Sequence, residues 1–406
     1  MSNREQALKV VRRLRKEGHQ ALFAGGCVRD HLLGRAAKDY DVVTDATPDQ
    51  IVPLFRKTLK IGAQFGVIMV ILDGKQVETA TFRTEGGYQD GRHPGHVEFA
   101  SAKEDASRRD FTVNGMFYDP IEKKVLDFVG GQEDLAKGIL RTIGEPEDRF
   151  GEDYLRLMRA VRFATQLNFE LEGRTWEALK KYAGKIRGIS AERIAMELEA
   201  VLTHPDRCKG VQLLIDSGLA EAIFPEFAGK AAEFGLNVLK GLSENVDFAL
   251  SSTAFWAGIP TKQALEWAKS LRLSNTTTKH VRFLLEKRGV LLEDQMPLAE
   301  LKLLLSEPYW DDLVELQTAI QKAKRESLEP LKTIRKRTKE LAGQDLRPKP
   351  LLDGHELMSL GATPGPMVGR LSREMYIAQL AEEIGTAEQA RRWVQGWLEK
   401  HKTPDF

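Results

Sequence analysis

The stretch FAGGCVRDHLLGRAAKDYDVVTD, residues 23–45, places a glycine pair between an apolar run and a segment typical of a helix start. Gly25 and Gly26 would let backbone N–H groups approach an anion closely, and the N-terminus of a helix favours negative charge. Arg29 would lie in the same turn. The segment therefore has the outline of a phosphate site, although it matches neither the GxGxxG nor the GxxxxGK[ST] pattern. An ordinary strand-to-helix turn is the alternative.

Asp39 and Asp41 are predicted to lie on a β-strand, where positions i and i+2 share one face. Two carboxylates so placed repel each other unless cations lie between them. Divalent metals held about 3.5–4 Å apart by paired carboxylates activate a hydroxyl and stabilise the leaving group of phosphoryl transfer. Mg²⁺ is the expected ion, because it prefers oxygen ligands and keeps substrate phosphates in its shell. A third carboxylate could come from Glu78 or from Asp110, and the sequence does not choose between them.

The rest of the sequence predicts an α+β multidomain protein. Up to about Asp127, short apolar runs rich in β-branched residues alternate with short helical pieces, as in a mixed α/β head. Beyond Gly131 the apolar residues recur at helical spacing, so we expect the remainder to be nearly all helix. A chain of 406 residues is long enough for more than one hydrophobic core.

The composition excludes several classes of protein. Lysine and arginine number 60 against 59 acidic residues, so any binding of nucleic acid must come from local patches. Cys27 and Cys208 belong to no CxxC or Cys/His cluster, which argues against a disulfide framework or a structural zinc site. The first twenty residues form a charged amphipathic pattern, and no apolar run approaches membrane-spanning length. We therefore expect a cytoplasmic protein that does not act on membranes.

Five segments carry a resemblance to one family. LFAGGCVRDHLLGRAAKDYDVVTDATP comes first, followed by RRDFTVN, DFVGGQEDL, EDYLR and ISAERIAMEL. In this order they resemble the motifs of the class II tRNA nucleotidyltransferases and bacterial poly(A) polymerases, within the DNA polymerase beta-like superfamily. The resemblance is close over the first half of the chain and loose beyond it. It implies a catalytic nucleotidyltransferase head over 1–137, a base-recognising helical neck over 138–203, a helical body over 204–310 and a tRNA-binding helical tail over 311–406.

The resemblance implies template-independent addition of the 3′-terminal CCA to tRNA from CTP and ATP. A ribose hydroxyl of the tRNA would attack the α-phosphate in line and release pyrophosphate. Asp39 and Asp41 would be catalytic and hold two Mg²⁺ ions. The RRDFTVN segment would contact the ribose, with Asp110 at a ribose hydroxyl. The other residues that the resemblance implies beside the nucleotide are Arg108, Arg109, Asn114 and Arg159.

The EDYLR segment is predicted to lie on a helix, where Asp153 and Arg156 at i and i+3 share a face. An acceptor and a forked donor side by side can bind the edge of one base bidentately, with a discrimination of about 1–3 kcal/mol. The family implies that these two side chains act as a protein template for CTP and ATP, and that Glu152 holds Arg156 in place. A surface salt bridge is the alternative, and the four companion motifs argue against it.

Residues 84–99, TEGGYQDGRHPGHVEF, are predicted to form a mobile loop. In the family, a full-length loop at this place favours complete CCA addition over CC addition, although an A-adding enzyme would also keep it. A poly(A) polymerase remains open too, but the chain lacks the arginine-rich segment and the long basic C-terminal extension associated with those enzymes. An inactive RNA-binding module is disfavoured, because two facing carboxylates would repel RNA. A fused HD-type phosphohydrolase is disfavoured because no His-Asp pair occurs.

Basic residues concentrate in residues 322–341, KAKRESLEPLKTIRKRTKEL. Contacts to phosphates would add affinity without reading sequence, as recognition of a tRNA acceptor arm by its shape requires. A solvated helix face is the alternative. The expected partners are the acceptor arm and 3′ end of tRNA and nucleoside triphosphates, and we expect a monomer, with a dimer left open. The RNA-binding candidates are Lys332, Arg335, Lys336 and Arg337.

Overall fold

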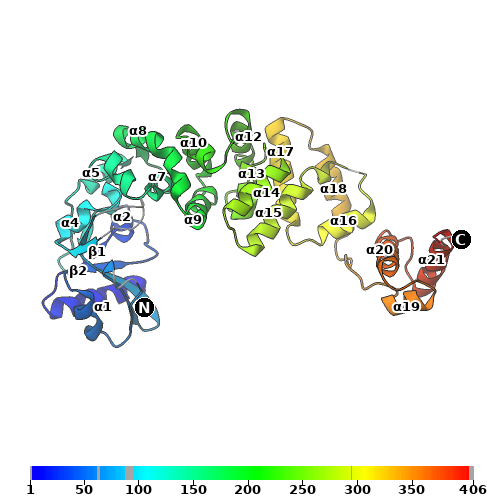
Figure 1. Ribbon diagram of the computed structural model, residues 1–406, viewed down its shortest axis with the longest axis horizontal. Coiled ribbons are helices and arrows are strands. Elements are labelled where there is room, and N and C mark those ends of the chain that lie inside the picture. Colours follow the sequence, from blue (N-terminus) through cyan, green and yellow to red (C-terminus); the bar gives the residue numbers. More distant parts are fainter. Residues whose placement is uncertain (1, 62–64, 87–95, 294, 402–406) are drawn as a thin grey trace. The chain divides into compact units, whose positions relative to one another are not determined.

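The computed structural model describes residues 2–61, 65–86, 96–293 and 295–401. The chain divides into two compact units. Unit 1 holds residues 1–232 and 269–273, and unit 2 holds residues 233–268 and 274–406. Figure 1 shows the labelled strands in the blue part of the chain and coiled ribbons from green to red. The predicted α/β head followed by a helical remainder is thus confirmed, whereas the finer division at 137, 203 and 310 stays a prediction.

A mixed sheet in the order β3-β4-β5-β2-β1-β8-β9 forms the centre of the head. Strand β2 pairs with β1 in antiparallel and with β5 in parallel orientation, so it lies inside the sheet. The strands are β1 (Ala21–Ala24), β2 (Asp41–Thr44), β3 (Thr58–Leu59), β4 (Val67–Leu72), β5 (Lys75–Thr81), β8 (Phe117–Asp119) and β9 (Lys124–Leu126).

Both faces of this sheet are covered, because successive side chains of a strand point to opposite faces. Phe23 of β1 packs in a core with Val10 and Leu14 of helix α1 (Asn3–Lys16). Its neighbour Leu22 packs on the other face in a core with Ala102 and Ala106 of helix α4 (Ala102–Ser107). Burial on both sides explains why β1 is apolar throughout rather than alternating.

Helices make up most of the remainder of unit 1. A two-stranded parallel sheet of β10 (Ile139–Leu140) and β11 (Glu170–Leu171) lies among them, which the helical periodicity beyond Gly131 did not predict. Two strands of two residues each are too short to produce an alternating pattern. The helices are α5 (Gly131–Lys137), α6 (Pro146–Glu152), α7 (Leu155–Leu167), α8 (Gly173–Tyr182), α9 (Ala191–Leu202), α10 (Arg207–Asp216) and α11 (Leu219–Ile223).

Unit 2 is helical throughout its described residues, and α12 (Gly229–Leu239) and α14 (Thr261–Ser270) cross the unit boundary. Among the residues with a described placement, no helix has the length and apolar character needed to cross a membrane. The helices within unit 2 are α13 (Phe248–Phe255), α15 (Asn275–Lys287), α16 (Leu298–Leu305), α17 (Trp310–Lys324), α18 (Glu329–Glu340), α19 (Gly354–Ser359), α20 (Pro366–Leu380) and α21 (Ala387–Lys400).

A buried histidine joins three of these helices. His280 of α15 is 6% exposed, and its ring stacks on Tyr309 with 3.9 Å between the centroids. Its Nδ1 lies 3.2 Å from Oδ2 of Asp247, which caps α13, and its Nε2 lies 3.0 Å from Oδ2 of Asp312 in the first turn of α17. Burial disfavours the charged ring, but the two carboxylates outweigh it and raise the pKa of His280 to about 9. Since each ring nitrogen faces a carboxylate, we interpret the cluster as an imidazolium clamp rather than a metal site.

The clamp predicts how the stability of unit 2 depends on pH. A histidine with a raised pKa stabilises the fold fully below its unfolded value of 6.5, and this stabilisation is lost as the pH rises through about 9. His280→Ala should lower the melting temperature below pH 6.5 by about 5 °C, since a hydrogen bond to a charged group contributes about 1.5–3 kcal/mol. Tryptophan fluorescence reports mainly unit 2, because all tryptophans except Trp176 lie there. An equal pH dependence of wild type and variant would contradict the clamp.

Candidate active site

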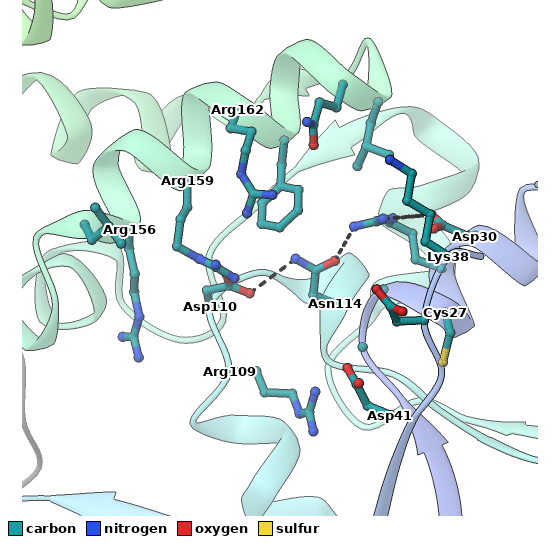
Figure 2. A pocket seen from close by; sticks show the side chains of 18 of the residues that line it. Cys27, Asp30, Lys38, Asp41, Arg109, Asp110, Asn114, Arg156, Arg159 and Arg162 are labelled. Atoms are coloured by element: carbon teal, nitrogen blue, oxygen red, sulfur yellow. Dashed lines mark hydrogen bonds and ion pairs between the residues drawn. The ribbon is translucent and has the colours of Figure 1, made fainter. Parts of the chain in front are cut away.

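A polar pocket of about 880 Å³ in unit 1 contains most of the predicted site residues. Figure 2 shows side chains from several elements pointing into this space. Two predicted residues of the head and neck do not line the pocket. They are Glu78 and Glu152, and Glu152 forms an ion pair with Arg156. The predicted residues in the lining are Gly25, Gly26, Arg29, Asp39, Asp41, Arg108, Arg109, Asp110, Asn114, Asp153, Arg156 and Arg159.

The glycine pair forms the turn between β1 and helix α2 (Gly26–Leu32). Gly25 has a φ of +69°, a conformation that other L-residues rarely adopt. A Cβ atom on Gly25 would also lie only 3.3 Å from Nη1 of Arg109. Glycine is therefore required here both by the turn and by the close approach of a guanidinium group.

A chain of polar contacts crosses the pocket floor, and Figure 2 shows its dashed lines. Arg159 of α7 donates to Oδ2 of Asp110 over 2.6 and 2.9 Å. Asn114 donates to Oδ1 of Asp110 at 3.3 Å and accepts from Nη1 of Arg29 at 2.8 Å, while Arg29 also pairs with Asp30. Burial disfavours the charged form of Asp110, but Arg159 outweighs it and holds the pKa of this carboxyl below its usual value. Asp110 is therefore bound by protein donors on both oxygens.

The metal-binding candidates lie at the edge of the central strands. Asp41 is the first residue of β2, whereas Asp39 lies in the irregular segment before it, so the prediction that one strand presents both was wrong. Glu78 of β5 is the neighbour of Asp41, because Val42 pairs with Thr79 in parallel register. Asp41 keeps part of its surface exposed, but the protein around its carboxyl group removes water from it. This loss of hydration and, next, the charge of Glu78 raise the pKa of Asp41 to about 6. The charge of Arg109 opposes the shift, and that of Asp39 adds to it.

Asp39, Asp41 and Glu78 are the carboxylates nearest to this edge of the sheet, but their oxygens do not all lie within 4.8 Å of one another; among the described residues, only Asp247, His280 and Asp312 form such a group. In the described part of the chain none of the three carboxylates forms a side-chain hydrogen bond or an ion pair. Carboxylate oxygens are ligands that Mg²⁺ prefers. Of the two candidates for the third carboxylate, Glu78 neighbours Asp41, while Asp110 is held by Arg159.

A buried aspartate that sequence analysis missed holds the two arginines of the RRD segment. Asp105 of α4 has no exposed surface, and its oxygens accept from Arg108 at 2.7 Å and from Arg109 at 2.9 Å. The two guanidinium groups outweigh burial and keep the pKa of Asp105 below its usual value. The i, i+3 and i, i+4 spacings of these residues were the available signal. Arg109 also lies over the ring of Phe117, so its direction into the pocket is fixed from two sides.

The prediction that the EDYLR segment lies on one helix was wrong. Helix α6 ends at Glu152, Asp153 is extended, with φ −146° and ψ 105°, and α7 begins at Leu155. Oδ1 of Asp153 accepts from the backbone N–H of Leu155, the first residue of α7, at 2.9 Å. Arg156 forms an ion pair with Glu152 and donates to the carbonyl of Arg149 at 2.8 Å. Asp153 and Arg156 nevertheless line the same pocket.

Four further basic side chains line the pocket that sequence analysis did not assign. Arg162 on α7 forms an ion pair of 2.6 Å with the buried Glu197 and lies over the ring of Phe163. Arg29 and Arg159 flank the same ring, so one aromatic side chain separates three guanidinium groups. Arg162 and Phe163 are neighbours on α7, whereas Arg29 and Glu197 come from elements far apart from them in sequence, so local spacing does not indicate these contacts. The other unassigned basic residues of the lining are Arg35, Lys38 and Arg193.

The basic residues of the tail lie on helix α18 in unit 2. Lys332, Arg335 and Lys336 are exposed, and Lys332 forms an ion pair with Glu329. Arg337 is half-buried and donates to the backbone carbonyl of Met296. Three of the four predicted side chains are thus accessible to a phosphate, while Arg337 is engaged in packing its helix.

The predicted loop over 84–99 lies in part outside the described residues, which omit 87–95. Residues 84–86 and 96–99, which the prediction placed in the loop, instead belong to strands β6 (Arg83–Gly86) and β7 (His96–Phe99), which pair in antiparallel register. The prediction of a loop over these two ends was therefore wrong.

The buried ion pairs of Asp105 predict that its removal lowers the stability of unit 1. Asp105→Ala leaves two guanidinium groups without their buried partner, and breaking such a pair costs about 3–5 kcal/mol. The urea midpoint of unit 1 should fall, as measured by hydrogen–deuterium exchange of its peptides. Glu145→Ala is the matched control, because it removes an exposed ion pair with Arg174 that contributes less than about 1 kcal/mol. Equal effects of the two substitutions would show that Asp105 is not a structural centre.

Two family models match the chain. The Poly A polymerase head domain matches residues 21–141, which contain the sheet and the carboxylates. The model described as probable RNA and SrmB-binding site of polymerase A matches residues 168–230.

Two known proteins with similar sequences are both named CCA-adding enzyme. The CCA-adding enzyme of Bacillus subtilis is 35% identical over 97% of both chains. That of Geobacillus sp. strain WCH70 is 44% identical over 216 residues, and the aligned part spans only about half of its length, 53% of each chain. The crystal structure of the Bacillus stearothermophilus CCA-adding enzyme in complex with CTP has 27% identity and a TM-score of 0.81, with 99% of both chains covered. Because the Bacillus subtilis relative aligns over nearly its whole length, the chain belongs to the CCA-adding enzymes, a family of nucleotidyltransferases.

Proposed function

We propose that the protein adds the 3′-terminal CCA to tRNA from CTP and ATP, without a nucleic acid template and with release of pyrophosphate. One observation carries the proposal: a single pocket is lined both by the carboxylates of Asp39 and Asp41 and by a fixed acceptor and donor pair, Asp153 and Arg156. The pocket volume is that of a nucleotide site. All its lining residues belong to unit 1, so one chain suffices for the reaction and a monomer is the proposed state.

Asp39, Asp41 and Glu78 would hold two Mg²⁺ ions. When bound, these ions supply Lewis acidity that activates the terminal hydroxyl of the tRNA and stabilises the developing charge on the leaving pyrophosphate. The glycine turn at Gly25 and the guanidinium of Arg109 provide backbone and side-chain donors for the triphosphate. Arg29, held by Asn114, adds positive charge on the other side of that turn.

The neighbouring polar chain would orient the sugar. Asp110 is fixed by Arg159, and a fixed carboxylate beside an amide can bind the hydroxyls of a ribose. The position of the reacting α-phosphate then follows from the sugar and from the carboxylate cluster. Such orientation contributes to the rate by converting a collision into a positioned reaction.

Selection of C and A would follow from hydrogen-bond polarity. Cytosine and adenine both present an amino donor next to a ring-nitrogen acceptor, whereas uracil and guanine present the reverse order. The carboxylate of Asp153 accepts from an amino group, and the guanidinium of Arg156 donates to a ring nitrogen. The reversed edge would leave buried polar groups unpaired, which is the stronger form of discrimination.

The tRNA would be bound in part by unit 2. The exposed side chains Lys332, Arg335 and Lys336 offer a phosphate-binding helix face without base contacts. Such contacts respond to salt and to the shape of the acceptor arm rather than to its sequence.

Primer extension tests the proposal. Three tRNA transcripts that end at the discriminator base, at C and at CC are incubated with CTP alone, ATP alone and both. We expect each transcript to be completed to CCA and then to stop. Addition confined to CC or to A would assign a CC-adding or A-adding enzyme. Long adenosine tails would overturn CCA addition in favour of a poly(A) polymerase.

Removal of one carboxylate tests the chemistry. Asp41→Ala should lower nucleotide incorporation by at least about a thousandfold, the size of effect expected for loss of a charge-stabilising group. Binding of tRNA in a filter assay should change little, since the variant removes no phosphate contact. Incorporation by Asp41→Ala at the wild-type rate would exclude the metal-binding role of this cluster.

A further inference from the structure

A second cavity lies in unit 2, and it shares no lining residue with the pocket of unit 1. Its volume of about 570 Å³ is within the range of ligand-binding sites. Its walls are helix α17, helix α18 and residues 241–243, which follow α12. Gly241 fits tightly against α17, because a Cβ atom added to it would lie 3.0 Å from Cβ of Ala319. The wall of residues 241–243 is therefore packed directly on α17.

Trp310 lines this cavity with a ring that the fold does not use. Its side chain is half-buried, and among the described residues no ring stacks on it, no cation lies over it and no group forms a hydrogen bond with it. The other tryptophans pack in an aromatic pair, in an apolar core or beside a lysine: Trp256 and Trp267, Trp393 and Trp397, and Trp176. The indole of Trp310 is thus available to a planar ligand.

The backbone that carries Trp310 is fixed on both sides. Tyr309 stacks on His280 with 3.9 Å between the centroids, and Oδ2 of Asp312 lies 3.0 Å from Nε2 of the same histidine. The N–H of Trp310 itself donates to the carbonyl of Glu307 at 3.2 Å. The imidazolium clamp therefore positions the indole before a ligand arrives, and such preorganisation lowers the free-energy cost of binding.

Charged groups are separated along the cavity. Asp311 and Glu315 lie in the first two turns of α17, as does Trp310. Lys322 lies in the last turn of α17, and Arg335 of α18 lines the same cavity. Both basic side chains are exposed, and in the described part of the chain neither forms an ion pair or a side-chain hydrogen bond. The cavity thus has carboxylate acceptors near an aromatic ring and unpaired cations farther along.

This combination of groups suits a nucleotide. An aromatic face stacks on any base, and a carboxylate accepts from the amino group of a base edge. Lysine and arginine bind phosphates without reading the sequence. A base inside a double helix is already stacked and paired, so only an unpaired nucleotide can reach the ring of Trp310.

Two observations favour an RNA strand over a free nucleotide. A helix rises about 1.5 Å per residue, so Trp310 and Lys322 are separated by about 18 Å along α17, a span suited to more than one nucleotide. Lys332, Arg335 and Lys336, at i, i+3 and i+4, share one exposed face of α18. Because Arg335 also lines the cavity, the basic face of α18 continues into it.

We propose that this cavity binds an unpaired segment of the tRNA, with one base stacked on Trp310 and neighbouring phosphates at Lys322 and Arg335. The inference rests on the proposed function, because the RNA is the same substrate. It adds a base contact in unit 2 to the phosphate contacts of α18. Since stacking accepts any base, the contact responds to an unpaired nucleotide rather than to a sequence.

Binding of a tRNA transcript without CCA, measured by filter assay at several salt concentrations, tests the two parts of the cavity. Trp310→Leu keeps an apolar side chain but removes the aromatic face, so it should raise the dissociation constant about fivefold to a hundredfold, the range of one stacked base. The dependence on salt should stay unchanged, because no charge is lost. Lys322→Ala should instead reduce the slope of log K against log salt by about 0.7, the value for one phosphate of a single strand.

Tryptophan fluorescence supplies a second readout, because stacking on a base quenches an indole. The tRNA should quench the emission of wild type more than that of Trp310→Phe, which retains an aromatic ring and should bind more tightly than Trp310→Leu. Lys324→Ala is the matched control for Lys322→Ala. It removes the same charge from the same helix, but Lys324 does not line the cavity and lies 4.0 Å from Glu326, so the dissociation constant should change less than twofold.

Dissociation constants within twofold of wild type in both Trp310→Leu and Lys322→Ala would overturn the inference. So would quenching by CTP alone that disappears in Trp310→Phe, since that would assign the cavity to a free nucleotide. If Trp310→Leu fails to fold, Trp310→Phe and Lys322→Ala carry the test with the same expected directions. Failure of wild type to extend tRNA would instead overturn the proposed function, so the two failures are distinguishable.

Discussion

The ion pair between Arg159 and Asp110 is the contact on which the pocket depends. Asp110 lies two residues before the turn η3 (Thr112–Asn114) of the head, and Arg159 lies on helix α7, so the pair connects the sheet-containing part of unit 1 to its helices. Its carboxylate is 8% exposed and would be unfavourable without a partner. From Asp110 the hydrogen bonds continue through Asn114 to Arg29, beside the glycine turn.

Charge is distributed unevenly in the pocket. Asp110 and Asp105 are matched by arginines and keep lowered pKa values. Burial raises the pKa of Asp41, the charge of Glu78 adds to this shift, and Arg109 compensates it only in part. Repulsion between neighbouring carboxylates lowers the stability of the fold. A cation bound between them would remove this repulsion, so the repulsion would favour binding of a divalent ion.

The sequence predicted what depends on local pattern. The glycine turn and the helical remainder follow from spacing and from backbone preferences, and the structure contains both. Asp39 and Asp41 line one pocket, although only Asp41 lies on the strand. The sequence did not predict contacts between distant elements, such as the support of Asp153 by Arg193, forty residues later. Asp105 was an intermediate case: its spacing to Arg108 and Arg109 was visible, but helices contain many such pairs on their surface, and only burial distinguishes this one.

The two errors in local geometry have one physical cause. Asp39 was expected on a strand and Asp153 on a helix, yet both lie just outside the regular element that follows. Within a helix, the side chain of Asp153 would point back along the preceding turn. In the extended break it can accept from the first N–H of α7 and still meet Arg193, which no helical residue could do with the same carboxylate. Side chains that must meet a ligand and a support together are favoured at element ends, where the periodic rules that guide sequence interpretation no longer hold.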